Sequence, residues 1–286
     1  MIITEPGIYD LTDAEYHADK NVPGGSLSSS GARTILKSPA LYQWERQHPV
    51  YKDVYDVGHA VHAKVLGVGL DTVEIPTDTL AANGATSTKA AKDFIAQARA
   101  EGKVPLKADV IAEINTMAES VLSHPLARAL LERPGRSEAS LFAPDPETGV
   151  WLRARIDRLP DAHPAGRTIA VDLKTGRSAD PAEFKRSAAD YGYDLQAEWY
   201  QAVLRQVRGD DDTAFVFIVV ESAAPHLVSV IELGGTFPQI GRDRMRRAID
   251  TFHHCRETGE WPGYDPVVHY VEPPRYYEIQ NEEPAA

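Results

Sequence analysis

The stretch "RTIAVDLKTGRSADP", residues 167–181, combines a strand pattern with a charged pair. Ile169, Val171 and Leu173 alternate with small or polar residues, which is the period of a strand with one apolar face. The alternation places Asp172 and Lys174 side by side on the other face, with the carbonyl of Leu173 between them. Spacing alone allows two interpretations of this pair, a solvated strand edge or a site of chemistry.

The preceding strand adds a second carboxylate. Apolar and polar side chains alternate along "WLRARIDRLP", residues 151–160, and Asp157 is among the polar ones. If the two strands are neighbours, Asp157 and Asp172 come together beside the Leu173 carbonyl, and such an oxygen-rich group suits Mg²⁺ or Mn²⁺. Lys174 would then orient a water molecule or offset charge that develops on phosphorus. Surface carboxylates explain the same spacing about equally well.

The order of the expected elements favours one α/β domain with a helical N-terminal part. Helices are expected over residues 30–47, with an interruption near Ser38 and Pro39, from about Val54 to 68, over 86–102 and over 107–132. A β-hairpin follows over 137–161, then the opening strand, a helix over 180–209 with Asp194 as a cap of its second half, two strands within 213–233, and a closing helix over 237–261. We divide this single domain, 1–286, into a helical part (1–135), the catalytic sheet and helix (136–235), and a closing helix with a polar tail (236–286).

Composition is that of a globular protein: 43% of the 286 residues are hydrophobic and 25% are charged. No apolar run approaches the ~18 residues that span a membrane, and the acidic N-terminus differs from a signal peptide, so we expect a cytoplasmic protein without membrane contact. Cys255 is the single cysteine, which excludes an internal disulfide and a cluster held by several cysteines.

Charge is unevenly distributed along the chain. The net charge of −12 argues against a general polyanion-binding surface. Residues 151–186 nevertheless hold eight basic and five acidic side chains, an excess of three positive charges. This stretch could bind a phosphate backbone, and a solvated mixed-charge surface explains it equally well.

The motifs together resemble a known nuclease family. "GVWLRARID" followed by "VDLKTG" is similar to the core of the PD-(D/E)xK nuclease superfamily. Five segments resemble, in order, the RecE-like (exonuclease VIII) phage and prophage exonucleases: "SLSSSGARTILKSPALY", "VGHAVHAKVLG", "SEASLFAPDPETGVWLRARIDRLPD", "AVDLKTGRSADP" and "YGYDLQAEWYQAVL". The resemblance runs from about Tyr9 to Trp261 and implies a central mixed sheet flanked by helices.

The resemblance also implies roles for individual residues. Asp157 and Asp172 correspond to the two metal-binding carboxylates, the Leu173 carbonyl to a further ligand, and Lys174 to the catalytic lysine. His62 corresponds to a metal ligand or an immediate neighbour of the metal. His59 and Glu138 are further candidates, and for Glu138 a surface position is an equal alternative.

Other residues correspond to positions around the reaction centre. Gln196 and Tyr200 are four residues apart, so they share a helix face, and the resemblance places them beside the active site, in contact with DNA or with Lys174. The candidate phosphate contacts, for which solvated side chains are the alternative, are Arg153, Arg155, Thr175, Arg177, Lys185 and Arg186.

These correspondences imply a Mg²⁺-dependent exonuclease that degrades double-stranded DNA ends 5′ to 3′ and leaves 3′ single-stranded tails; Mn²⁺ is a plausible substitute. They further imply a RecT-like annealing protein as partner, a cyclic homo-oligomer, a bacterial cytoplasm as location, and no iron–sulfur cluster. The alternatives are a single-strand nuclease or an endonuclease of the same superfamily, another metal-dependent phosphohydrolase, and a non-catalytic protein that binds DNA ends or a partner.

Overall fold

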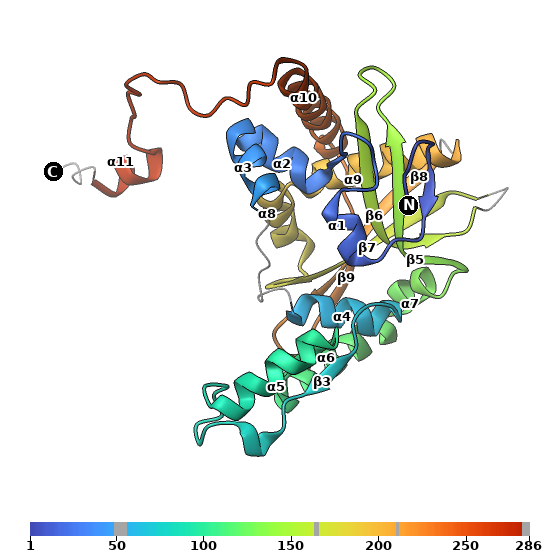
Figure 1. Cartoon of the computed structure of the whole chain (residues 1–286), viewed down its shortest axis with the longest axis vertical. Helices are drawn as coiled ribbons and strands as arrows, with labels where there is room; N and C mark the ends of the chain where they lie inside the picture. The colour runs from blue at the N-terminus through green and yellow to red at the C-terminus, as the bar shows by residue number, and fades with distance from the viewer. Residues whose placement is uncertain (49–55, 163–165, 210–211, 282–286) are drawn as a thin grey trace.

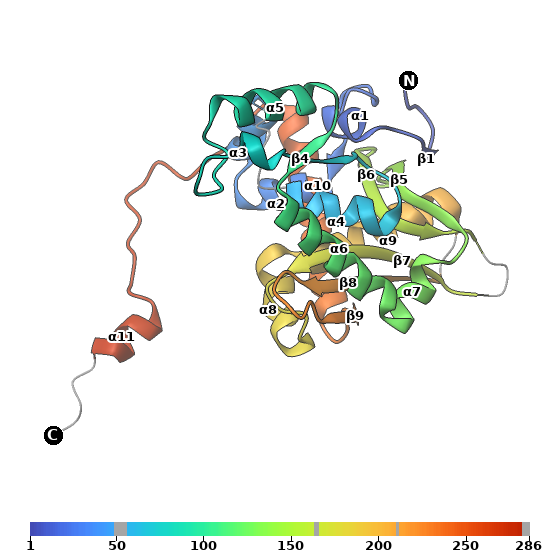
Figure 2. The same ribbon diagram turned by 90° about the horizontal axis from the view of Figure 1, so that it is seen from below.

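A mixed β-sheet lies between two layers of helices in the computed structural model of the chain (Figures 1 and 2). The structure describes residues 1–48, 56–162, 166–209 and 212–281. Val54, at the expected start of one helix, and the last five residues of the tail lie outside these ranges. The expected fold class, an α/β protein with a central mixed sheet and a helical N-terminal part, is confirmed.

The main sheet has the strand order β1-β5-β6-β7-β8-β9, and β2 pairs with β6 outside this path. The pairs β2–β6 and β7–β8 are parallel and the others are antiparallel. The strands are β1 (Gly7–Tyr9), β2 (Leu27–Ser28), β5 (Gly135–Pro144), β6 (Trp151–Pro160), β7 (Thr168–Gly176), β8 (Thr213–Glu221) and β9 (Val228–Glu232). The predicted hairpin is β5–β6, and the strand predicted from the alternation around Asp172 is β7.

Each face of the sheet has its own apolar core. On one face Trp199 and Phe217 belong to a core formed with α2 (Ser29–Lys37), α9 (Tyr193–Arg208) and α10 (Phe237–Thr258). On the other face Val61, Leu173 and Ile218 pack with α4 (Asp56–Leu66), α6 (Ala108–Ser123) and α7 (Pro125–Leu131). Because β7 contributes to both cores, Asp172 is buried and Lys174 is half-buried, and a solvated strand edge is excluded for Asp172.

The remaining elements lie around this sandwich, except the last helix, α11, which lies apart from it (Figure 1). They are α1 (Asp13–Ala18), α3 (Pro39–Gln47), β3 (Thr72–Glu74), the short 3₁₀ turn η2 (Thr77–Thr79), α5 (Lys89–Ala100), β4 (Val104–Leu106), α8 (Pro181–Tyr191) and α11 (Arg275–Asn281). Strands β3 and β4 form a separate parallel pair. No helix within the described ranges is both long and apolar enough to cross a membrane.

Proline and glycine set helix boundaries that the apolar periodicity did not reveal. The interruption at Ser38 is confirmed, and its hydroxyl accepts a hydrogen bond from the Leu41 amide at the start of α3. The single helix expected over 107–132 is wrong, because Pro125 starts a new helix and disfavours helical backbone at the residue before it. The helix expected over 180–209 divides at Gly192, whose φ is 68°.

Asp194 does not cap the second half of that divided helix, contrary to our expectation. Its side chain is buried and accepts a hydrogen bond from Arg244 Nη1 at 2.7 Å. The ion pair joins α9 to α10. Asp194 thus contributes to the packing of two helices rather than to a helix end.

We predict that Gly241 in α10 is required for this packing. A Cβ atom there would lie 2.4 Å from the carbonyl oxygen of Asp194, and backbone cannot rotate away as a side chain can. The overpacking should cost about 1–3 kcal/mol, which exceeds the roughly 1 kcal/mol that alanine gains over glycine in helix propensity. Gly241→Ala should therefore lower the Tm, measured by calorimetry, by about 2 °C or more.

The matched control is Gly234→Ala, because a Cβ atom at Gly234 would have no neighbour within 4 Å. This variant should leave the Tm within about 1 °C of the unsubstituted protein. Equal values of Tm for the two alanine variants would contradict the packing argument.

Candidate active site

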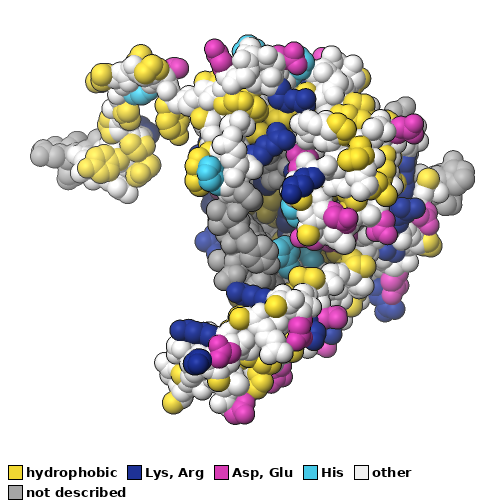
Figure 3. Space-filling view, viewed as in Figure 1, with side chains coloured by type: hydrophobic (Ala, Val, Ile, Leu, Met, Phe, Trp, Pro, Cys, Tyr) yellow, Lys and Arg dark blue, Asp and Glu magenta, His cyan; other side chains and the backbone are white. Residues whose placement is uncertain are grey.

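A cleft of about 420 Å³ collects most of the predicted site residues. It is bordered by α4, the start of α2, strands β5 to β7 and the first turns of α9. His59, His62, Glu138, Asp157, Lys174, Gln196 and Tyr200 all line it, together with Arg153 and Arg155. Figure 3 shows a hollow between the helical lobe that carries α4 to α6 and the rest of the molecule, with histidine, lysine and arginine side chains at its border.

The cleft forms where β6 and β7 separate. The two strands pair at Arg158 and Val171. Two residues further along β7, the amide of Leu173 donates a hydrogen bond to Asp157 Oδ2 at 2.7 Å rather than to a backbone carbonyl of β6. The Asp157 carboxylate therefore takes the place of the backbone carbonyl that would accept this hydrogen bond in a regular sheet. The buried Leu173 amide thus keeps a partner although the two strands separate.

Both strands of the β5–β6 hairpin are irregular at this opening. Leu152, Ala154 and Ile156 face the same core as Leu159, so the alternation of β6 shifts by one residue at Asp157 and Arg158. Opposite this shift, Glu138 has a φ of 51°, a left-handed conformation that costs a residue with a side chain roughly 1–2 kcal/mol. The distortion lets the side chains of Asp157 and Glu138 reach the same cleft.

Three of these side chains could hold a metal ion. One ligand atom each from His62, Glu138 and Asp157 lie within 4.8 Å of one another, and His62 Nδ1 is 3.4 Å from Asp157 Oδ2. This brings together a helix residue and two strand residues that are far apart in the sequence. Glu138 thus faces the candidate metal site and not the outer surface.

Asp172 lies beside this group with one oxygen held and one oxygen available. Gln196 Nε2 donates to Asp172 Oδ1 at 2.6 Å. Asp172 Oδ2 is buried and receives no hydrogen bond of normal geometry, although Lys174 Nζ lies 2.6 Å away. A buried carboxylate oxygen without an aligned donor next to two further carboxylates and an imidazole fits a hard divalent cation such as Mg²⁺ or Mn²⁺.

The crowding of acids shifts the titration of the site. Burial, and then the charges of Asp172 and Glu138, raise the pKa of Asp157 well above its usual range. Burial also lowers the pKa of His62, which outweighs the opposing effect of Asp172. The imidazole is therefore held in its neutral form, able to donate a lone pair to a metal, whereas a charge on Asp157 is disfavoured in the metal-free protein.

Lys174 remains charged in this environment. Burial by itself would lower the pKa of Lys174, but the carboxylates of Asp172 and Asp157 raise it above the usual value. The ammonium also lies 5.0 Å from the ring centre of Tyr193 and 5.9 Å from that of Phe217. Lys174 is thus a fixed cation and hydrogen-bond donor, unsuited to act as a general base.

The two predicted residues of α9 contribute differently. Gln196 contacts Asp172, so it orients a carboxylate rather than Lys174. Tyr200 is buried, its ring meets Phe215 edge-on at 5.5 Å, and burial raises the pKa of its hydroxyl well above the usual value. Tyr200 closes the inner end of the cleft.

The candidate phosphate contacts fall into two groups. Arg153 and Arg155 are committed to ion pairs within the protein, Arg153 with Asp19 at 2.6 Å and Arg155 with Glu138 at 2.7 Å. Thr175, Arg177 and Arg186 line a second cavity next to the cleft, and Lys185 is exposed on α8.

Sequence reasoning missed several side chains of the cleft. Ser28, Ser30 and Arg33 enter it from the start of α2, and Tyr193 enters it from the start of α9. The run of serines before a helix was visible as a signal, because such a helix start presents free amides to an anion. Nothing in the local pattern indicates that Tyr193 lies over Lys174.

We predict that Asp157 limits the stability of the metal-free protein. The pKa of Asp157 is raised in the folded protein. The carboxyl therefore does not lower the free energy of unfolding at acidic pH, where it is protonated, but lowers it as the pH rises through that pKa. Asp157→Asn keeps an oxygen for the Leu173 amide but carries no charge. At pH 7.5 in EDTA it should raise the Tm by about 2 °C or more.

We expect Mg²⁺ or Mn²⁺ to raise the Tm of the unsubstituted protein, because a ligand that binds only the folded state stabilises it, and we expect Asp157→Asn to abolish this increase. Asp265→Asn, at an exposed position, serves as the control for a lost charge. It should change neither the Tm in EDTA nor the increase in Tm on addition of metal. A lower metal-free Tm for Asp157→Asn, or a metal response that persists, would overturn this assignment.

Solved structures with similar architecture include a candidate exonuclease from Eubacterium rectale, with a TM-score of 0.57, 11% identity, and coverage of 96% of this chain and 100% of the other. The structures of SSO0001 (TM-score 0.29, 13% identity, 70% and 84% coverage) and of LHK-Exo in complex with dAMP (TM-score 0.23, 12% identity, 73% and 98% coverage) are more distant, and their scores support no argument about this chain. At 11% identity the first likeness concerns the fold alone. No curated protein matches the sequence.

A comparison with protein families matches most of the chain. Residues 28–272 match a family described as a PDDEXK-like domain of unknown function (DUF3799), and this range contains His62, Glu138, Asp157, Asp172 and Lys174. The superfamily expectation is thereby confirmed, and the protein belongs to this family of PDDEXK-like domains.

Proposed function

We propose that the protein is a metal-dependent exonuclease that degrades double-stranded DNA ends 5′ to 3′ in the cytoplasm of a bacterial host and leaves 3′ single-stranded tails for recombination by strand annealing. The observation that carries this proposal is the convergence of His62, Glu138, Asp157, Asp172 and Lys174 on one cleft. The family and the fold of the candidate exonuclease from Eubacterium rectale support the nuclease part. The RecE-like resemblance of the sequence is the support for polarity and product.

The residues of the cleft have separable roles in this reaction. His62, Glu138 and Asp157 would hold the cation, with Asp172 beside them and the Leu173 carbonyl as the further ligand that the resemblance implies. When bound, a divalent cation polarises a phosphoryl oxygen and lowers the pKa of water. Lys174 stabilises negative charge that develops on the phosphate, and Gln196 keeps the Asp172 carboxylate in place.

Linear duplex labelled at the 5′ or the 3′ end tests the proposal. With Mg²⁺ we expect early release of the 5′ label as a mononucleotide and no release in EDTA. Lys174→Ala should lower the rate by roughly 10²–10³-fold, because it removes the fixed cation of the site. Lys92→Ala, an exposed position on α5, is the matched control and should retain the rate.

Other outcomes would select the alternatives. Early loss of the 3′ label would contradict the polarity, and cleavage of covalently closed circles would indicate an endonuclease. Cleavage of single strands alone would indicate a single-strand nuclease. If no DNA is cleaved with Mg²⁺ or Mn²⁺ while DNA ends are still bound, a non-catalytic binding protein becomes the better interpretation.

The proposal includes a cyclic homo-oligomer around DNA and a RecT-like annealing protein that receives the 3′ tail. Support for subunit contact comes from the segment after α10, which leaves the body and leads to α11 in both views (Figures 1 and 2). Tyr264, Val268 and Tyr270 in this segment are each more than four-fifths exposed. Apolar side chains gathered at such exposure are typical of surfaces that another chain covers.

We therefore expect light scattering to give the mass of a closed oligomer. Replacing Val268 and Tyr270 by serine should reduce that mass, whereas the same change at Val57, an exposed residue outside the segment, should not. A monomeric mass of the unsubstituted protein at micromolar concentration would contradict the ring.

A further inference from the structure

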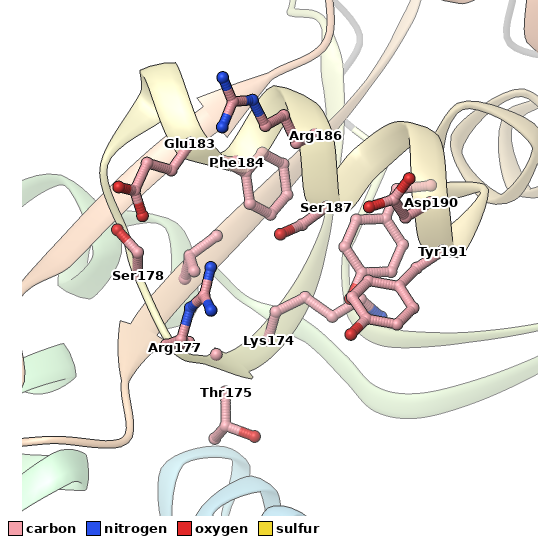
Figure 4. Close-up of a pocket in the computed structure, with 13 residues that line it drawn as sticks. Lys174, Thr175, Arg177, Ser178, Glu183, Phe184, Arg186, Ser187, Asp190 and Tyr191 are labelled. Atoms are coloured by element: carbon pink, nitrogen blue, oxygen red, sulfur yellow. The ribbon is translucent and has the colours of Figure 1, made fainter. Parts of the chain in front are cut away.

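A second cavity of about 480 Å³ lies beside Lys174, between the end of β7 and α8. It shares Lys174, Tyr191 and Tyr193 with the catalytic cleft, so the two cavities meet at these side chains. Figure 4 shows Lys174 and Tyr191 close together on one side of the second cavity and Arg177 on the other. Its volume is within the range of cavities that bind small ligands.

The cavity presents two arginines, Arg177 and Arg186. Within the part of the chain that the structure describes, no carboxylate forms an ion pair with Arg177 or Arg186, in contrast to Arg153 and Arg155 in the cleft. The guanidinium of Arg177 extends from the end of β7 towards the ring of Phe184 (Figure 4). Such a group is able to bind a phosphate oxygen.

The balance of charge limits what the cavity can hold. Its lining has three cationic side chains, Lys174, Arg177 and Arg186, and two acidic ones, Glu183 and Asp190, an excess of one positive charge. Lys174 is moreover paired with Asp172, which leaves the two arginines balanced by the two acids. This balance favours a phosphodiester, with one negative charge, over the multiply charged phosphate groups of a nucleoside di- or triphosphate.

An aromatic wall complements the arginines. Tyr191 is 60% exposed and its ring centre is 5.8 Å from that of Tyr193, which stacks on Phe184 at 5.6 Å. An exposed ring with rigid aromatic support is a stacking platform for nucleobases of any sequence. The alternation of a cation and an aromatic face is the arrangement found where proteins bind single strands.

We infer that the second cavity binds the single DNA strand next to the bond that is cleaved, with a phosphodiester on Arg177 and a base stacked on Tyr191. This inference rests on the proposed nuclease function, because it places the strand across Lys174. Recognition is independent of sequence, since neither group reads a base edge.

Binding without hydrolysis tests the inference. The probe is a fluorescent single-stranded oligothymidine of eight nucleotides, measured by anisotropy in EDTA so that no cleavage occurs. Tyr191→Ala and Arg177→Gln should each weaken binding by about 10-fold. Tyr191→Phe keeps the ring and should bind as tightly as the unsubstituted protein. Arg177→Gln should also reduce the slope of log K against log salt by about 0.7, the value for one single-strand phosphate contact.

Arg247→Gln is the matched control, because Arg247 is exposed on α10 and lies outside both cavities. Circular dichroism confirms that each variant is folded. If Arg177→Gln and Arg247→Gln weaken binding equally, or if Tyr191→Ala has no effect, the inference is overturned. A larger loss for a blunt duplex than for the single strand would also overturn it, since the occupant would then be the duplex backbone.

The two proposals can fail separately. Lost strand binding in EDTA supports the second cavity even if the protein proves to lack nuclease activity. Conversely, normal 5′ degradation by Arg177→Gln and Tyr191→Ala, together with unchanged strand binding, would leave the nuclease proposal intact and remove the second cavity from it.

Discussion

The hydrogen bond from the Leu173 amide to the Asp157 carboxylate is the constraint on which the site depends. It joins β6 and β7 where their regular pairing ends, and so allows the sheet to open without an unsatisfied buried amide. The opening admits His62 from α4 on one face and Gln196 from α9 on the other. A regular ladder at this point would bring the strands together and leave no space for a substrate.

The site is arranged at a cost in free energy. Glu138 adopts a left-handed backbone, the charges of Asp172 and Glu138 raise the pKa of Asp157, and one oxygen of Asp172 has no aligned donor. Lys174 offsets part of this charge, and a bound cation would offset more. Strain and like charges that persist in a buried position are typical of a functional site, because packing alone would select against both.

Much of the fold was predictable because it depends on local pattern. The period of two in residues 167–176 and 151–160 identified β7 and β6, and the same alternation placed Asp172 beside Lys174. The errors arose where one residue overrides periodicity, as at Pro125 and Gly192, which divide helices that the apolar pattern joins. The burial of Asp172 was also undecided, since alternation shows which residues share a face but not what covers that face.

The sequence by itself therefore determined the five strands β5 to β9, most helices, and the identity of the chemical groups on Asp157, Asp172, Lys174 and His62, whereas the short strands β1 to β4 carry too few residues for a periodic pattern. Only the tertiary structure decided which of them meet, because the contacts of Glu138 with Arg155, of Arg153 with Asp19 and of Lys174 with Tyr193 depend on how distant elements pack. The second cavity also depends on tertiary structure: Arg177 follows β7 and Tyr191 ends α8, and the fold of this segment makes them two sides of one space. Periodicity is a property of neighbours in the chain, whereas a cavity is a property of neighbours in space.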